Sequence, residues 1–296
     1  MFVVGLTGDV GAGKSTVASM LSEFGASIIS ADGVVVEVWK DKSVWEAVRN
    51  RWGEDVFSDK GVPLPGRISD IVFEDEEEYK WLCNLIHPRV RAQLEAKVLF
   101  STGLIVAEIP LLFENGLPWW VDFSVYVTSP LAQRVNRNKS RGWDEYELFR
   151  RERWLIPQET KCKAADWVIM NDKGLNELRG EVYKLLDFLK KISCCIEGFF
   201  TCGSFDEAER IARSLLEKRL VACTNIVGVD SRYLWLGNLE SDQEYLVIFK
   251  SVENLFPQIE NVVREAHSYA LPVITAQRME KVSLEVRKWI LEECNS

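Results

Sequence analysis

The apolar positions in the first two thirds of the chain fall into short runs separated by longer stretches of mixed character. Runs of four or five residues bounded by turn-forming residues predict buried strands. They lie at residues 2–6, 26–30, 104–108, 123–127 and 167–170. Between them, apolar residues spaced three and four apart, as over 88–100, predict amphipathic helices. This alternation predicts an α/β domain with a parallel sheet wrapped by helices.

After a helix predicted at 175–190, the elements follow in a different order. Ser204 and Glu207 have the spacing of a capping box, which predicts that a helix starts there. Strands are predicted at 194–201, 221–227, 232–235, 244–250 and 273–277, with a turn at 236–238 and a helix over 253–267. The order β-α-β-β-β-α-β with a final helix predicts a ferredoxin-like α+β domain.

The length of the chain also favours two domains. Its 296 residues exceed the usual size of a single domain. The Lys-Lys-Ile-Ser segment at 190–193 follows the last helix of the α/β pattern and is the expected junction. We therefore predict one domain over residues 1–191 and a second over 194–296.

Composition and charge exclude several classes of partner. The net charge is −9, and acidic groups outnumber basic groups in both predicted domains. This balance argues against extensive binding of nucleic acid or of an anionic membrane. The chain has no apolar run of 18 residues, and its first residues predict a strand rather than a signal peptide. Its seven cysteines include no C-x-x-C pair, so we expect a cytoplasmic protein without a disulfide framework.

A phosphate-binding motif directly follows the first predicted strand. The segment GLTGDVGAGKST contains the pattern G-x-x-x-x-G-K-[ST], with Gly8, Gly13, Lys14 and Ser15 at its fixed positions. Glycines let successive backbone N–H groups turn toward phosphate oxygens, and the following helix adds its positive N-terminal end. In this motif Lys14 reaches the β and γ phosphates, and Ser15 ligates Mg²⁺. The motif predicts binding of a nucleoside triphosphate.

Other polar residues at strand ends indicate the reaction. Asp32 follows the second predicted strand, at the sheet edge where the phosphate loop also lies. A carboxylate there accepts a proton from an acceptor hydroxyl in a kinase, whereas an aspartate before a glycine and an apolar run is also a helix cap. Both interpretations of Asp32 remain open. The N-K-x-D motif of GTPases is absent from the sequence, which favours a kinase.

A basic segment over residues 131–163 is typical of the mobile lid of such kinases. It holds nine basic and five acidic groups, against the acidic trend of the chain. A solvated helix face is the alternative explanation for any one of its charges. The basic residues are Arg134, Arg137, Lys139, Arg141, Arg150, Arg151, Arg153, Lys161 and Lys163.

Five motifs in order resemble those of the dephospho-coenzyme A kinase family over about residues 1–187. They are GLTGDVGAGKSTVA, SADG around Asp32, LIHPRVR, IPLLFENGL and KCKAADWVIMND. The resemblance implies a P-loop kinase with a parallel sheet and a helical lid. It also implies transfer of the γ-phosphate of ATP to the ribose 3′-hydroxyl of dephospho-coenzyme A, with Mg²⁺, as the last step of coenzyme A synthesis.

The resemblance also assigns roles to residues. Lys14, Asp32, Arg137 and Arg141 would be catalytic, and Asp32, His87 and Arg91 would bind the acceptor. Locally, His87 before Pro88 is equally typical of a helix start, so a structural role for His87 stays open. The residues that would bind ATP are Gly8, Gly11, Ala12, Gly13, Lys14, Ser15, Thr16, Arg151 and Asn171.

The sequence departs from the family pattern at four positions. Asp9 replaces a glycine, Ser30 and Glu108 each replace an aspartate, and Leu155 replaces a glutamine. Asp9 brings a negative charge to a phosphate site unless its side chain points outward. The spacing of the arginines at 134–141 is also shifted by one, which leaves individual lid assignments open. We expect the protein to be an active kinase, and reduced or altered kinetics are the alternative.

The second predicted domain resembles the divalent-cation-tolerance (CutA-type) family over about residues 196–290. The segments ERIARSLLEKRLVACTNIV, RYLWLGNLESDQEYLVIFKS and REAHSYALPVI carry this resemblance. It implies a homotrimer linked to divalent metals such as copper. Cys223 and His267 are the soft and imidazole candidates for weak metal ligands, although Cys223 also suits a buried core position. Ser268 and Val273 stand where the family has proline and glutamate, which weakens the metal interpretation.

Two further functions remain as alternatives. The altered Ser30-Ala31-Asp32 segment is also compatible with another small-metabolite or nucleoside kinase on the same fold. A metal-responsive binding protein with a regulatory nucleotide domain is the third possibility. Each predicts different partners, whereas the leading hypothesis predicts ATP, dephospho-coenzyme A and two further copies of the chain.

Overall fold

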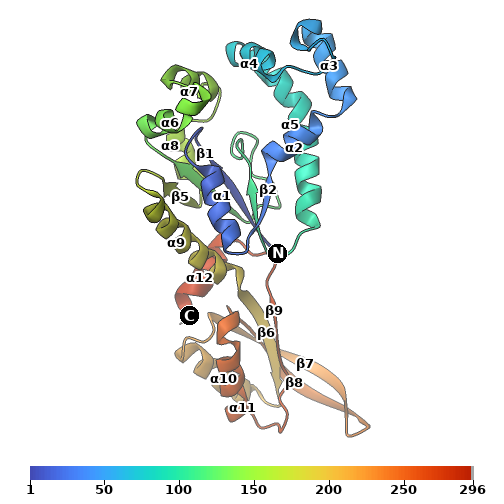
Figure 1. Ribbon diagram of the computed structural model, residues 1–296. Coiled ribbons are helices and arrows are strands. Elements are labelled where there is room, and N and C mark those ends of the chain that lie inside the picture. The colour runs from blue at the N-terminus through green and yellow to red at the C-terminus, as the bar shows by residue number, and fades with distance from the viewer. Residues whose placement is uncertain (295–296) are drawn as a thin grey trace. The chain divides into compact units, whose positions relative to one another are not determined.

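The computed structural model describes residues 1–294 and divides into two compact units. The first runs from Met1 to Leu185, and the second begins at Leu186 (Figure 1). The division falls inside the helix α9 (Leu175–Ser193). This division does not test the junction predicted between residues 191 and 194, which stays a prediction. None of the helices within residues 1–294 is long and apolar enough to cross a bilayer.

The first unit is built on a five-stranded parallel sheet with the order β2-β3-β1-β4-β5. This confirms the predicted α/β fold with its five strands. β1 and β4, near the centre of the sheet, are buried along their whole length, because helices cover both faces of such a sheet. The strands are β1 (Phe2–Gly8), β2 (Ser27–Ser30), β3 (Leu104–Glu108), β4 (Phe123–Thr128) and β5 (Trp167–Met170).

Two groups of helices rise beyond the carboxyl edge of this sheet. Figure 1 shows α3, α4 and the upper part of α5 above the β2 side, and α6 to α8 above the β5 side. The helices are α1 (Lys14–Glu23), α2 (Ala31–Val38), α3 (Lys42–Trp52), α4 (Pro65–Glu74), α5 (Glu76–Leu99), α6 (Leu131–Asn138), α7 (Glu145–Glu152) and α8 (Gln158–Ala164). Short 3-10 turns lie at η1 (Glu54–Val56) and η2 (Lys139–Arg141).

The helix predicted over 88–100 starts earlier than expected, since α5 already begins at Glu76. The Asp75 side chain caps it by accepting bonds from the N–H groups of Glu77 and Glu78, at 2.7 and 3.2 Å. Three acidic residues in the first turn add favourable interactions with the helix dipole. Pro88 therefore lies inside the helix, and the interpretation of His87-Pro88 as a helix start is wrong.

The second unit contains a four-stranded antiparallel sheet with the order β7-β8-β6-β9. With its two intervening helices this is the predicted ferredoxin-like arrangement. The strands are β6 (Cys195–Cys202), β7 (Cys223–Trp235), β8 (Asn238–Val252) and β9 (Ile274–Arg278). The helices are α10 (Phe205–Glu217), η3 (Glu253–Leu255), α11 (Phe256–Ala266) and α12 (Leu284–Glu293).

The two strands predicted at 221–227 and 232–235 are one continuous strand, β7. It pairs with β8 without interruption, from Cys223 opposite Lys250 to Trp235 opposite Asn238. The ladder continues through residues 228–231, which separate the two predicted strands, because backbone pairing with β8 does not depend on side-chain type. Leu236 and Gly237 form the turn with φ of 49° and 87°, the positive values of a two-residue hairpin turn. The element order is thus β-α-β-β-α-β with a final helix.

A buried arginine ties the last helix to the rest of the second unit. Arg287 is 3% exposed, and its guanidinium donates to the carbonyls of Ile192 at 2.8 Å, Glu280 at 2.9 Å and Met279 at 3.2 Å. Removing the guanidinium would leave these buried carbonyls without their charged donor, which is costly.

We predict that Arg287→Met lowers the free energy of unfolding of the second unit by about 2–4 kcal/mol. Urea unfolding of the full chain, followed by hydrogen exchange of amides in the second unit, measures this change. The control is Arg213→Met, which removes an exposed arginine paired with Glu209 at 3.2 Å and should have little effect. Equal losses in both variants would contradict a structural role for the Arg287 hydrogen bonds.

Candidate active site

The phosphate loop connects β1 to α1, and Gly11 and Gly13 within it are positions where only glycine fits. Gly11 and Gly13 have φ of 74° and 102°. A Cβ atom on Gly11 would lie 2.1 Å from the side-chain nitrogen of Asn138, and one on Gly13 would lie 2.5 Å from that of Asn171. The Asn171 amide itself donates to the Ala12 carbonyl at 2.8 Å. The loop is therefore held closely against the segments that follow β4 and β5.

Lys14 is the first residue of α1, and its side chain folds back across the loop. Its ammonium Nζ donates to the carbonyls of Gly8 at 3.1 Å and Asp9 at 3.0 Å. Burial lowers the pKa of Lys14, while the negative charges of Glu108 and Asp32 act in the opposite direction. This arrangement holds a cation where the phosphates of a nucleotide would lie.

Ser15 and Glu108 form a polar pair at the carboxyl edge of the sheet. Glu108 is the last residue of β3, opposite Leu6 in β1, so the parallel register brings it beside the loop. The Ser15 hydroxyl donates to its carboxylate at 2.9 Å, and Glu108 is only 8% exposed. A hydroxyl and a carboxylate are hard oxygen donors of the kind that Mg²⁺ prefers, so these residues fit that ion.

Of the two orientations left open for Asp9, the structure shows the inward one. It is 7% exposed, and its carboxylate accepts hydrogen bonds from Thr128 at 2.6 Å and from the Tyr126 hydroxyl, both in β4. Burial and the bond to Asp9 raise the pKa of Tyr126, so this hydroxyl remains a donor. The two hydroxyl donors thus stabilise the negative charge of Asp9. Because both lie in β4, they hold the start of the phosphate loop against that strand.

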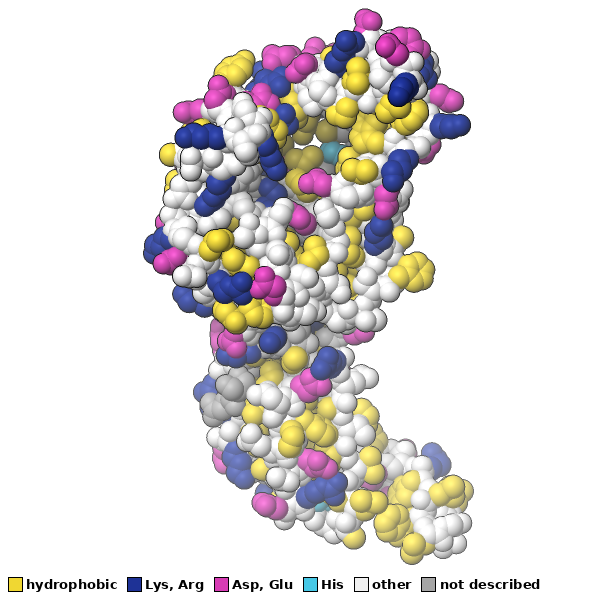
Figure 2. All heavy atoms as spheres, in the orientation of Figure 1, with side chains coloured by type: hydrophobic (Ala, Val, Ile, Leu, Met, Phe, Trp, Pro, Cys, Tyr) yellow, Lys and Arg dark blue, Asp and Glu magenta, His cyan; other side chains and the backbone are white. Residues whose placement is uncertain are grey.

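Asp32 lies in the first turn of α2 rather than at its cap. The N-cap of α2 is Ser30, so the interpretation of Asp32 as the helix cap is wrong. A carboxylate in the first turn is favoured by the helix dipole and needs no capping role. The Asp32 side chain lines a cavity of about 870 Å³ together with Lys14, Ser15 and Glu108. Figure 2 shows a hollow in the first unit with charged side chains at its rim.

Three of the predicted lid arginines line this cavity. Arg137 donates to the Ala12 carbonyl at 3.2 Å and to the Asn171 carbonyl at 3.1 Å. Arg151 lies over the ring of Trp143, with its guanidinium carbon 3.9 Å from the ring centroid, and Arg141 lies 5.2 Å from the same centroid. Arg137, Arg141 and Arg151 all line the cavity, and Arg151 also pairs with Glu147 at 2.7 Å.

Three further basic residues of the segment form ion pairs instead. Arg134 is 7% exposed and pairs with Glu152 at 2.7 Å. Arg150 binds Glu147 at 2.7 Å and reaches α4. Lys161 is also buried and pairs with an acidic side chain. These charges form ion pairs within the first unit, so neither a phosphate contact nor a simple solvated face describes them.

Two residues that shape the site were not identified from the sequence. The carboxylate of Glu152 in α7 accepts the backbone N–H of Val10 at 2.9 Å, which joins the lid to the phosphate loop. Trp143 carries the stacked guanidiniums of Arg141 and Arg151. An acidic residue within a basic segment, and a tryptophan between arginines, were the only signals available.

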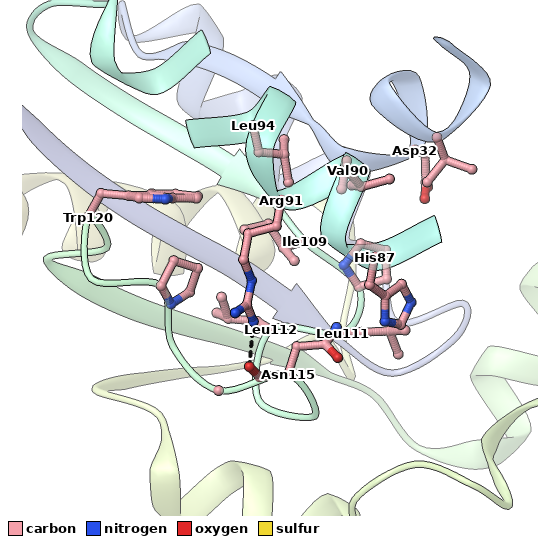
Figure 3. Close-up of a pocket in the computed structure, with 15 residues that line it drawn as sticks. Asp32, His87, Val90, Arg91, Leu94, Ile109, Leu111, Leu112, Asn115 and Trp120 are labelled. Carbon is pink, nitrogen blue, oxygen red and sulfur yellow. Dashed lines mark hydrogen bonds between the residues drawn. The ribbon is translucent and has the colours of Figure 1, made fainter. Parts of the chain in front are cut away.

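The acceptor-side candidates His87 and Arg91 lie on one face of α5. His87 lines the large cavity and also a smaller one of about 150 Å³, and Asp32 lines both as well (Figure 3). The Arg91 guanidinium donates to the Asn115 carbonyl at 2.6 Å. Burial lowers the pKa of His87, which favours its neutral form. Leu155 also faces the large cavity, so the departure at this position changes the lining of the site.

The predicted metal pair of the second unit does not come together within one chain. The β-ladder places Cys223 opposite Lys250, which pairs with Glu197, five residues along β6 from Cys202. His267 instead contacts Cys202, with Nε2 3.7 Å from Sγ. At about 3.3 Å per residue, Cys223 lies some 17 Å along the sheet from His267.

Cys202, Glu207 and His267 do converge, with one possible ligand atom from each within 4.8 Å of the others. Each of these three side chains already has a hydrogen-bond partner or carries a proton. Burial raises the pKa of Cys202 to about 12, so the thiol keeps its proton at neutral pH. The Glu207 carboxylate accepts the N–H of Ser268 at 2.5 Å, and His267 Nε2 lies 2.7 Å from the Thr201 carbonyl. A soft metal would have to displace these partners, so the donor set as it stands fits one poorly.

Comparisons with known proteins match a different family to each of the two units. A family model described as dephospho-CoA kinase matches residues 2–177, and one described as CutA1 divalent ion tolerance protein matches residues 197–293. The dephospho-CoA kinase of Aquifex aeolicus is 33% identical over 191 residues, which is 64% of this chain and 97% of the relative. That of Thermus thermophilus is 35% identical over 179 residues, 60% of this chain and 86% of the relative.

Among solved structures, TT1252 from Thermus thermophilus is similar, with a TM-score of 0.55 and 33% identity. The match covers 64% of this chain and 97% of that one. The first family model spans more than half of the chain, and the relatives are matched over most of their length. The chain therefore belongs to the dephospho-CoA kinase family of enzymes and carries a CutA1 domain after its kinase domain.

Proposed function

We propose that this protein transfers the γ-phosphate of ATP to the ribose 3′-hydroxyl of dephospho-coenzyme A, giving coenzyme A and ADP. One observation carries the proposal. The phosphate loop, the Ser15–Glu108 pair, Asp32 and the lid arginines all line one cavity. A kinase needs a nucleotide cradle, a place for Mg²⁺ and an acceptor carboxylate within one site.

ATP would bind with its phosphates in the loop over residues 8–16. The backbone N–H groups and the N-terminal end of α1 favour the triphosphate. Lys14 would exchange its bonds to the Gly8 and Asp9 carbonyls for the β and γ phosphates. Arg151 and Asn171 stay the candidates for contacts to the nucleotide, since Arg151 lines the cavity and Asn171 borders the loop.

Ser15 and Glu108 would hold Mg²⁺, which neutralises charge on the β and γ phosphates when bound. Glu108 has a longer side chain than the family's aspartate, and in this structure it already receives the Ser15 hydroxyl. The pair is thus arranged before the nucleotide enters. Glu108 is buried, whereas Ser15 is exposed at the cavity, where the ion would enter.

The chemical step follows from the position of Asp32. Its carboxylate would accept the proton of the 3′-hydroxyl as the oxygen forms a bond to the γ phosphorus. The bond from that phosphorus to the bridging oxygen of ADP breaks in the same step, and ADP leaves with that oxygen. Lys14, Arg137 and Arg141 would stabilise the charge on the transferring group. His87, held neutral by burial, would orient the acceptor beside Asp32.

We also propose that the second unit joins three chains into a homotrimer and that the enzyme acts in the cytoplasm. Apolar side chains gather at the tip of the β7–β8 hairpin (Figure 2). Leu234, Leu236 and Leu239 are 74%, 88% and 75% exposed. Such a patch on a single chain supports an interface with another copy. All seven cysteines are free, which is compatible with a reducing compartment.

Lys14→Ala should lower kcat/KM for phosphorylation of dephospho-coenzyme A by about 10²–10³-fold, because it removes a charge that stabilises the transferring phosphate. Coupled measurement of ADP and coenzyme A formation gives the rate. The matched control is Lys184→Ala, which removes an exposed lysine paired with Glu181. A Lys14→Ala enzyme as active as this control would refute the assignment.

Asp32→Asn should reduce kcat by about 10²–10⁴-fold with little change in the KM for ATP, because the amide cannot accept the proton. Steady-state kinetics with both substrates varied separate the two constants. Asp59→Asn, at an exposed position outside the cavity, controls for the loss of one negative charge. A fall in ATP affinity without a fall in kcat would instead assign Asp32 to nucleotide binding.

Sedimentation equilibrium should give the mass of three chains for the protein. The double variant Leu234→Glu, Leu239→Glu should give the mass of one chain, because charges in the apolar patch oppose its burial. Its kinase activity should be unchanged, since both positions lie in the second unit. A single-chain mass for the parent protein would contradict the trimer proposal and leave the kinase proposal unaffected.

A further inference from the structure

We propose that the small cavity beside Asp32 binds the purine base of the acceptor nucleotide. The inference rests on the proposed function and assigns a place to one part of its substrate. The cavity, of about 150 Å³, is bounded by α2, α5 and the loop that follows β3 (Figure 3). It is distinct from the phosphate loop, which lines only the larger cavity.

The position of the cavity follows from the acceptor's own geometry. Asp32, His87 and Leu111 line both the small and the large cavity, so the two meet at the catalytic carboxylate. In the acceptor, the base is bonded to C1′ and the reacting hydroxyl to C3′ of the same ribose, with only C2′ between them. When the hydroxyl lies at Asp32, the base must lie in an adjoining space. The small cavity is such a space.

The walls of the cavity suit a flat, uncharged ring. Val90, Leu94 and Trp120 are 7%, 4% and 4% exposed, and Leu112 is almost fully buried. The cationic side chain of the wall, Arg91, already donates to the Asn115 carbonyl. An apolar cavity of this volume can take up a benzene ring. The negatively charged diphosphate of the acceptor would lose its hydration there without gaining a free cation.

One polar group in the wall lacks a partner. The indole N–H of Trp120 is buried and has no acceptor among residues 1–294. Figure 3 shows this indole extending toward Leu94 and Arg91. A buried donor without an acceptor is unfavourable, and the ring nitrogens of a purine are acceptors. Binding of the base, with a small movement of the indole, would supply the missing partner.

The rest of the acceptor has a different place available. A second apolar groove, of about 570 Å³, is bounded by α2 to α5 and shares Val35, Trp39 and Leu82 with the large cavity. A long flexible arm requires more space than the small cavity offers. This leaves the small cavity to the compact base at the other end of the acceptor.

The test compares dephospho-coenzyme A with its 1,N⁶-etheno analogue, in which a fused ring enlarges the base and leaves the ribose and arm unchanged. The parent enzyme should use the analogue with a kcat/KM at least about tenfold lower. Leu94→Ala enlarges the cavity and should reduce this discrimination to near unity. Val98→Ala, one turn further along α5 and buried outside all three spaces, should keep it. The KM for ATP should be the same in all three proteins.

Equal use of both acceptors by the parent enzyme would overturn the inference, as would identical discrimination in Leu94→Ala and the parent. Val90→Ala replaces Leu94→Ala if the latter fails to show a folded thermal transition. If the parent turns over neither acceptor, the proposed function fails, but the fluorescence of the etheno base still reports binding. Tighter binding to Leu94→Ala than to the parent would then support the base site, and equal binding would exclude it.

Discussion

The parallel pairing of β1 with both β3 and β4 is the constraint on which the active site depends. Parallel strands present their carboxyl ends at one edge, so the loop after β1, Glu108 at the end of β3 and Thr128 at the end of β4 become neighbours. Ser15 then reaches Glu108, and Asp9 reaches Thr128. Neither contact could form if the strands were shifted by one residue, because each side chain would face the opposite side of the sheet.

Buried charges around the phosphate loop hold it in place before any nucleotide binds. Asp9 is fixed by two hydroxyl groups of β4, and Glu152 joins Arg134 to the N–H of Val10. Each charge has a partner, as buried charges require. Arg137 adds bonds to the Ala12 carbonyl. The resulting loop is pre-organised, which lowers the entropic cost of binding a triphosphate in the reactive geometry.

The sequence was sufficient for the features that depend on local chemistry. Buried parallel strands read as continuous apolar runs, and the phosphate motif has a fixed spacing, so the sheet, the loop and the position of Asp32 could all be predicted. Features that depend on contacts between residues far apart in the sequence could not be predicted. Pro88 lies inside α5 because a cap at Asp75 starts the helix, β7 is continuous because β8 pairs with it, and Cys202 lies beside His267 because of the sheet register. The inward side chain of Asp9 likewise depends on β4, far away in sequence.

We propose that the first unit phosphorylates the 3′-hydroxyl of dephospho-coenzyme A. Phosphorus NMR of the purified protein with ATP, Mg²⁺ and dephospho-coenzyme A tests it most directly, because the product is identified by its own resonance. We expect a new 3′-phosphomonoester signal that grows in step with ADP. ATP hydrolysis to free phosphate without this signal, or phosphate transfer to a different hydroxyl, would contradict it.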